Sequence, residues 1–149
     1  MSPYEKAQAI LADLVARAAA ESPEPRVLPS IQYAQIGAPR TVTCESLVVG
    51  AATVAADGAD DSESIMCDAI QVGTFMLVYA LDCSWTSDED GTDNPELVAE
   101  VSGRVDAAGD FLWAYANELD PFLSKEWSLG FTMTGGLGIA TLTLTTGID

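Results

Sequence analysis

The sequence predicts an α+β fold in which a mostly antiparallel β-sheet packs against two helices, within a single domain that spans residues 1–149. Two amphipathic helix patterns, one at the start of the chain and one over residues 94–119, alternate with strand-like segments. The last two of these segments alternate apolar and polar residues on either side of a Gly-Gly pair. Helices that cover one face of a sheet are one of the few arrangements in which such elements bury their apolar sides.

The first helix is expected over about residues 3–20. Ser2, Pro3 and Glu5 form its start signal, because serine caps the first turn, proline suits the first helical position and glutamate can bond back to the serine amide. The apolar residues that follow at helical spacing are Ala7, Ile10, Leu11, Leu14, Val15 and Ala18. The proline-rich segment 22–25 should end the helix, since proline cannot continue its hydrogen-bond ladder.

Strand patterns fill the middle of the chain. Residues 31–36 form one expected strand and residues 42–49 the next, and a short turn at residues 38–40 favours a hairpin between them. The proline and glycine near this turn also permit a longer crossing. Residues 51–63 are small and acidic, and we expect them to form a solvent-exposed loop.

Residues 70–85 are the most apolar segment of the chain, and residues 75–81 are almost continuously apolar. This pattern is typical of a strand that is covered on both faces, or of one whose second face meets another subunit. A second acidic segment, residues 88–93, separates this strand from the second helix.

The helix over residues 94–119 is the strongest structural signal in the sequence. Asn94, Pro95 and Glu96 supply a cap, a proline at the first position and an acid where the helix dipole favours it, and Pro121 marks the end. At 100° per residue the apolar side chains fall within a stripe about 100° wide. These side chains are Leu97, Val98, Val101, Val105, Ala108, Leu112, Tyr115, Ala116 and Leu119.

A hairpin is expected at the carboxyl end. Bulky apolar residues alternate with small or polar ones over residues 127–134, and alanine or leucine alternates with threonine over residues 139–146. Gly135 and Gly136 between them supply the turn. The glycines are not a phosphate-binding loop, because the lysine and the following helix of such a loop are missing.

The charge of the chain argues against nucleic-acid binding. The sequence has 23 acidic residues against 6 lysines and arginines and no histidine, for a net charge of −17. Proteins that bind DNA or RNA rely on lysine and arginine to displace counterions from phosphates. No apolar run reaches the roughly 18–20 residues needed to cross a bilayer, so no membrane partner is expected.

No catalytic, metal or cofactor site is expected. A serine or cysteine nucleophile would lack a histidine base, and spacing alone cannot select a carboxylate pair among 23 acids. Asp88 and Asp90 match the third and fifth places of a calcium loop, but Thr86 and Leu97 stand where its first and twelfth places need carboxylates. We therefore expect a protein that is not an enzyme.

The three cysteines, Cys44, Cys67 and Cys83, form no CxxC pair, and the chain shows no secretory leader pattern. These features favour a reducing compartment. Cys44 and Cys83 lie in apolar strand-like runs, where we expect a free thiol to be buried like a small apolar side chain.

Two aromatic residues of the second helix lie off its apolar stripe. Trp113 lies about 60° beyond one edge of the stripe and Phe111 about 40° outside the other. They either widen the buried face or contact a second subunit, for which aromatic side chains are well suited. Phe111 and Trp113 are thus the candidate subunit-interface residues.

The layout of the chain resembles that of tail terminator proteins of long-tailed, siphovirus-type bacteriophages, particularly those that infect actinobacteria. The resemblance covers essentially the whole chain. It lies in the opening amphipathic helix, the β-rich middle with its acidic loop, the long helix begun by Asn94-Pro95-Glu96, and the closing hairpin rich in threonine and glycine. The abundance of alanine, valine and aspartate with few lysines also fits such a source.

This resemblance implies a structural virion protein located at the tail-neck junction and assembled in the host cytoplasm. Members of the family form a hexameric ring that caps the tail tube, stops its polymerisation and joins it to the head-side neck. The implied partners are the tail tube protein and a head-tail stopper or connector protein. DNA would pass through the ring without specific binding, because an acidic lumen repels it. The candidate lumen or junction residues are Asp57, Asp60, Asp61, Glu63, Asp88, Glu89, Asp90 and Asp93.

Three alternatives remain open. Another neck component, such as a stopper or a head-completion protein, shares the acidic character, although stoppers tend to be smaller β-barrels without a long helix. A small acidic enzyme or ligand-binding domain would require a deep pocket lined by paired carboxylates. An acidic inhibitor that mimics DNA would carry carboxylates on one convex face, whereas the acids here concentrate in the expected loops.

Overall fold

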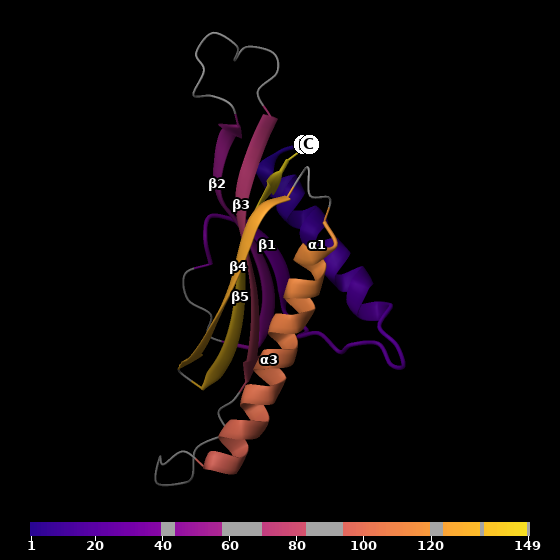
Figure 1. Ribbon diagram of the computed structural model, residues 1–149, viewed down its shortest axis with the longest axis vertical. Coiled ribbons are helices and arrows are strands. Elements are labelled where there is room, and N and C mark those ends of the chain that lie inside the picture. Colours follow the sequence, from indigo (N-terminus) through magenta and orange to yellow (C-terminus); the bar gives the residue numbers. More distant parts are fainter. Residues whose placement is uncertain (40–43, 58–69, 83–93, 120–123, 135, 149) are drawn as a thin grey trace.

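In the computed structural model, two helices lie on one side of a single five-stranded sheet (Figure 1). The structure describes residues 1–39, 44–57, 70–82, 94–119, 124–134 and 136–148. In chain order the elements are α1 (Pro3–Ala19), β1 (Gln32–Ile36), β2 (Ser46–Asp57), β3 (Ile70–Asp82), α3 (Pro95–Asn117), β4 (Ser124–Thr134) and β5 (Leu137–Gly147). The predicted α+β class is confirmed, and so is the mostly antiparallel sheet.

The strand order is β1-β2-β3-β5-β4, so β1 and β4 are the two edges of the sheet. The pairs β2–β3, β3–β5 and β4–β5 are antiparallel, and the expected hairpin at the carboxyl end is confirmed. The apolar strand β3 lies at the centre, where five consecutive residues, Leu77 to Leu81, are all buried. The interpretation of this segment as a strand covered on both faces is therefore correct.

Of the two connections that the sequence allowed between the first two strands, the hairpin is wrong and the longer crossing is correct, because β1 runs parallel to β2 with Gln32 opposite Leu47. A parallel pair requires the chain to cross back before the second strand begins. Gly37, at the start of this crossing, donates its N–H to the carbonyl of Ala51 at 2.8 Å. The described start of the crossing, residues 37–39, lies on the sheet face opposite the helices, where Pro39 lies directly over Gly50.

Strand β2 begins and ends later than the sequence pattern predicts. It starts at Ser46, so Cys44 precedes the strand and its thiol is exposed, which corrects the expectation of a buried cysteine. The part from Ala51 to Asp57, expected as a loop, is strand and pairs with β3. Small side chains do not prevent a backbone ladder when the neighbouring strand supplies its hydrogen-bonding groups.

Helix α1 begins as its start signal predicts. The side chain of Ser2 accepts a hydrogen bond from the backbone N–H of Glu5 at 3.1 Å, and Pro3 is the first helical residue. The helix buries the apolar residues that recur every three or four positions, namely Ala7, Ile10, Leu14 and Ala18. Val15, by contrast, lies on the surface.

Helix α3 is capped by Asn94, whose side chain accepts hydrogen bonds from the backbone N–H groups of Glu96 and Leu97. Its buried residues are Val101, Val105, Ala108, Gly109, Phe111, Leu112, Tyr115 and Ala116. They pack mainly on β5 and β4, while α1 packs on β1 and β2. Within the described part of the chain, neither helix has the length and apolar character that a membrane span requires.

Because two tyrosines are buried between the sheet and the helices, Tyr79 on β3 and Tyr115 on α3, we expect the protein to lose stability at alkaline pH. Burial raises the pKa of both Tyr79 and Tyr115, although Arg26 acts in the opposite direction on Tyr79. The unfolded chain releases these phenolic protons near pH 10, whereas the folded protein retains them. Above about pH 10, the free energy of unfolding should therefore fall by up to about 1.4 kcal/mol per pH unit for each tyrosine.

Urea titrations followed by circular dichroism at several pH values between neutral and strongly alkaline would measure this slope. Tyr115→Phe removes one of the two titrating groups and keeps the ring, so the decrease above about pH 10 should become shallower. If this variant loses stability above about pH 10 as steeply as the wild type, Tyr115 does not contribute to the decrease in the free energy of unfolding at alkaline pH.

Candidate functional site

The exposed apolar side chains gather along the two edges of the sheet. Of the large apolar side chains that are exposed in the described residues, most lie either beside β4 or beside β1. Isolated exposed apolar residues are normal, but contiguous patches are typical of interaction sites. These two surfaces are therefore the candidate functional sites.

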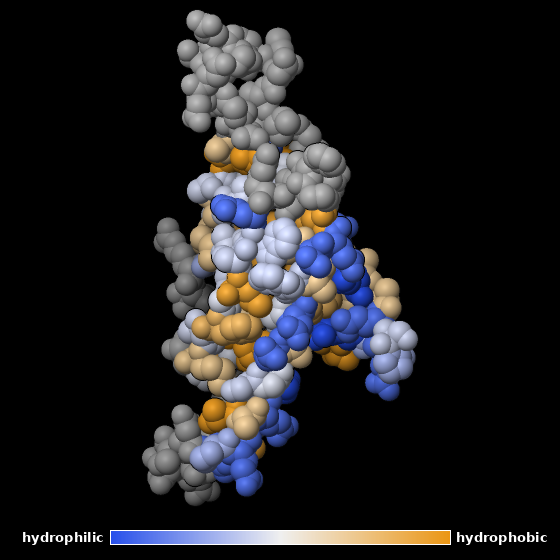
Figure 2. All heavy atoms as spheres, viewed as in Figure 1, coloured by the Kyte–Doolittle hydropathy of each residue, from blue (hydrophilic) through white to orange (hydrophobic). Residues whose placement is uncertain are grey.

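The first is the α3/β4 surface, which consists of Gly109, Trp113, Trp127, Leu129, Phe131 and Met133. Alternate residues of a strand share one face, so β4 presents its four members of this set on the side of α3. Phe131 and Met133 are 52% and 44% exposed, because the helix covers them only in part. Figure 2 shows orange and tan side chains along the β4 edge, beside the blue outer surface of the helices.

Gly109 lets α3 approach β4 closely. A Cβ atom at this position would lie 2.6 Å from Cε1 of Phe131 and 3.1 Å from Cδ2 of Leu129. No side chain separates the helix from these two residues, so the Phe131 ring rests directly on the helix backbone. The glycine thus fixes the shape of the α3/β4 surface.

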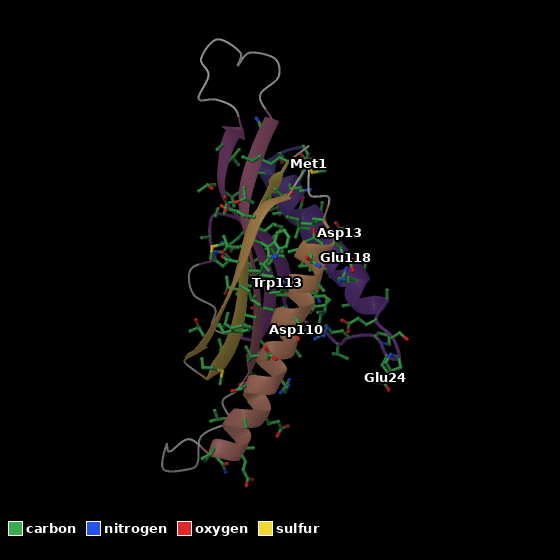
Figure 3. All side chains as sticks on the ribbon, viewed as in Figure 1. Met1, Asp13, Glu24, Asp110, Trp113 and Glu118 are labelled. Atoms are coloured by element: carbon green, nitrogen blue, oxygen red, sulfur yellow. The ribbon has the colours of Figure 1, made fainter. Side chains whose placement is uncertain are left out.

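Trp113 is the most prominent member of this surface. It is 44% exposed, and its ring meets Trp127 edge to face with the centroids 5.9 Å apart. Figure 3 shows Trp113 between α3 and β4, whereas Glu118 lies on the side of the helix that faces α1. Trp127 is more deeply buried, and its Nε1 has no hydrogen-bond acceptor among the described residues.

Phe111 does not belong to either surface. Its side chain is 3% exposed, it meets Tyr79 edge to face at 6.1 Å, and the Arg26 guanidinium lies 4.8 Å from its ring centroid. The expected subunit contact through Phe111 is therefore not supported, and the alternative, a wider buried face of the helix, is the correct one for this residue. The contact through Trp113 stays a prediction.

The second surface is a groove of about 580 Å³ between α1 and the edge strand β1, which we call the α1/β1 groove. It is lined by Tyr4, Gln8, Leu11, Ala12, Val15, Ala16, Gln32, Tyr33 and Ala34. None of these side chains is charged, although 19% of the residues in the chain are. The side-chain amide of Gln32 already donates a hydrogen bond to the carbonyl of Pro29 at 2.8 Å.

The backbone of β1 offers open hydrogen-bonding groups along this groove. Leu47 donates its N–H to the carbonyl of Ile31, and Gly37 donates its own to β2. Because these groups alternate along a strand, those of Gln32, Ala34 and Ile36 point away from β2. Within the described residues no strand pairs with this edge, so it can accept a further strand or side chains.

A smaller cavity of about 390 Å³ lies where α1 and α3 meet, and its charges pair with one another. Arg17 donates to both carboxylate oxygens of Glu118, at 2.5 and 2.7 Å, and Arg26 donates to Glu21 at 3.1 Å. The hydrogen bond with Arg17 lowers the pKa of Glu118. Exposed ion pairs of this kind contribute little stability, and the cavity offers no unpaired arginine to a ligand.

The acidic candidates can be placed only in part. Asp57 ends β2, whereas the other seven lie outside the described residues: Asp60, Asp61, Glu63, Asp88, Glu89, Asp90 and Asp93. In the described part of the chain, no three residues of the types His, Cys, Asp and Glu gather in a way that could hold a metal ion. The lumen or junction role of the acidic residues stays a prediction.

The geometry thus presents two uncharged surfaces at opposite edges of one sheet, on a chain that is otherwise strongly acidic. Sequence reasoning found Trp113 but missed the α1/β1 groove, since it counted Leu11 and Val15 among the residues that bury the helix. The chain matches no protein-family model, and no curated protein matches it either.

Proposed function

We propose that the protein is a structural assembly protein of a long-tailed bacteriophage, a tail terminator that caps the tail tube as a closed ring. The observation that carries this proposal is the pair of unlike apolar surfaces at opposite edges of the sheet. A contact between two unlike surfaces is heterologous, and its repetition generates a ring when the rotation closes. A protein that binds itself only as a two-fold dimer needs one such surface, not two.

The charge of the chain supports self-assembly through these surfaces. Each copy carries a net charge of −17, so copies repel one another unless the contact excludes charged side chains. The lining of the α1/β1 groove contains no charged side chain. The six residues of the α3/β4 surface are themselves uncharged, and the exposed Asp106 lies one helical turn from Gly109 at its border. The acidic remainder of the chain then has a role in the ring, because it repels the DNA that passes through the lumen.

The partners in this proposal are the tail tube protein on one side of the ring and a stopper or connector protein on the other. The protein acts in the virion and not as an enzyme, and DNA passes through the lumen of the ring without specific binding. A different ring of the neck would have the same charge and symmetry. It would bind the portal side and would leave the growth of the tube unaffected.

Sedimentation velocity and negative-stain electron microscopy test the proposal. We expect closed rings of six copies, alone or on the ends of tubes formed by the tail tube protein of the same genome, and tubes that stop growing once capped. Monomers at tens of micromolar that neither assemble nor limit tube growth would overturn the proposal. A portal, a capsid protein and a stopper encoded upstream, with the tube protein directly downstream, would support it independently.

A further inference from the structure

We propose that the α3/β4 surface of one copy docks into the α1/β1 groove of the next copy. This inference rests on the proposed function, since it requires the protein to associate with itself, and it deepens that function by naming both halves of the contact. The occupant of the groove is therefore a second copy of this chain.

The positions of the two surfaces allow this contact when two copies stand side by side. Both lie on the helix side of the sheet, one at the β1 edge and the other at the β4 edge, with β2, β3 and β5 between them (Figure 1). When two copies stand edge to edge with their helices on the same side, β4 of one meets β1 of the other. The same placement brings the α3/β4 surface against the groove, and it can be repeated from copy to copy.

The chemistry of the two surfaces is complementary. The α3/β4 surface projects aromatic side chains, with Trp113 and Phe131 about half exposed, and such residues dominate the binding energy of many interfaces. The groove is concave and presents the apolar side chains of Leu11 and Val15, and Tyr33 contributes to its lining at the β1 edge. The open backbone groups of β1 lie along the same edge and can pair with a neighbouring strand.

Charge favours a second copy over other occupants of the groove. A basic partner would gain most by binding the acidic parts of the chain, not a groove without charged residues. A small polar ligand would need several convergent polar side chains, but apart from two tyrosines the lining carries only the amides of Gln8 and Gln32, and the Gln32 amide already donates to Pro29. Another copy is as acidic as the first, so it can approach closely only where both surfaces are uncharged.

Two single variants, studied apart and mixed, test the pairing. Val15→Glu places a charge in the groove, and Trp113→Glu places one on the α3/β4 surface; both positions are on the helix surface, where the monomer tolerates a polar side chain. We expect each variant to be monomeric. An equimolar mixture should form a one-to-one dimer, because Val15→Glu keeps an intact α3/β4 surface and Trp113→Glu keeps an intact groove.

Sedimentation velocity with one variant fluorescently labelled distinguishes the outcomes. A mixture that stays monomeric, or a Val15→Glu variant that assembles like the wild type, would overturn the pairing of these two surfaces. In either case the proposed function would stand if the wild type still forms rings. A wild type that is itself monomeric, alone and with the tube protein, would instead remove the proposed function together with this inference.

Discussion

Replacing Trp113 by glutamate should weaken assembly strongly and leave the monomer folded. The side chain is 44% exposed, and within the monomer its ring forms an edge-to-face pair with Trp127, which contributes about 0.5–1.5 kcal/mol. A central aromatic side chain of an interface contributes about 2 kcal/mol or more, which corresponds to a roughly 30-fold weaker contact. A new carboxylate at this place also adds to the repulsion between two acidic copies.

The matched control for this variant is Ala107→Glu. Ala107 is exposed on the same helix, about 120° around the axis from Trp113, so it introduces the same charge away from the α3/β4 surface. We expect Ala107→Glu to assemble like the wild type. The two variants would be compared by sedimentation velocity for assembly and by thermal unfolding for the fold.

Thermal unfolding decides between the two roles that the sequence allows for Trp113. If Trp113→Glu no longer unfolds cooperatively, the residue belongs to the core, and the main evidence that the α3/β4 surface is a subunit contact is lost. If the variant melts like the control but assembles as well as the wild type, Trp113 is exposed without making a contact. Only a folded variant that fails to assemble agrees with the proposal.

The sequence predicts the helices and the last hairpin well because their signals are local. Ser2 and Asn94 cap the first turns of α1 and α3, and the apolar spacing gives their buried sides. The hairpin β4–β5 joins neighbouring segments across a short turn. In each case, the residues that decide the structure lie within a few positions of one another.

The pairing of β1 with β2 could not be predicted in the same way. The five residues of β1 are compatible with either a parallel or an antiparallel pairing with β2. The choice depends on how the segment that follows β1 packs over β2. The second half of β2 has a similar origin, because Thr53 and the residues after it become strand by pairing with β3. Such information lies in contacts between distant segments and not in the composition of either one.

The candidate site was predictable only in outline. Phe111 and Trp113 both lie off the apolar stripe, and periodicity alone cannot tell which of them is exposed. The difference comes from distant segments, since Arg26 and Tyr79 enclose Phe111. Phe131 alternates like a buried strand residue, yet it is half exposed, because α3 covers only the part of its ring that rests on Gly109. The sequence contained one indication of the groove: the apolar stripe of α1 includes Leu11 and Val15 and is wider than the edge of the sheet that the helix covers.

Gly50→Ala should strongly destabilise the fold, because the added methyl group would collide with the segment that crosses from β1 to β2, whose course the sequence left undecided. A Cβ atom at Gly50 would lie 2.4 Å from the carbonyl oxygen of Gly37 and 2.6 Å from Cδ of Pro39. Overpacking of this kind costs about 1–3 kcal/mol. The backbone of Gly37 cannot yield freely, since its φ is 93° and its N–H is bonded to Ala51 at 2.8 Å.

Gly130→Ala is the matched control, because it makes the same change in a strand where no atom lies within 4 Å of the added Cβ. The control should be neutral or stabilising by about 0.5–1 kcal/mol, as it removes the excess freedom of glycine from the unfolded chain. Urea unfolding of both variants measures the difference between the two free energies of unfolding. Equal stabilities would mean that the crossing moves aside at no cost. A selective loss in Gly50→Ala would show that the crossing holds β1 in place, and with it the strand on which the α1/β1 groove is built.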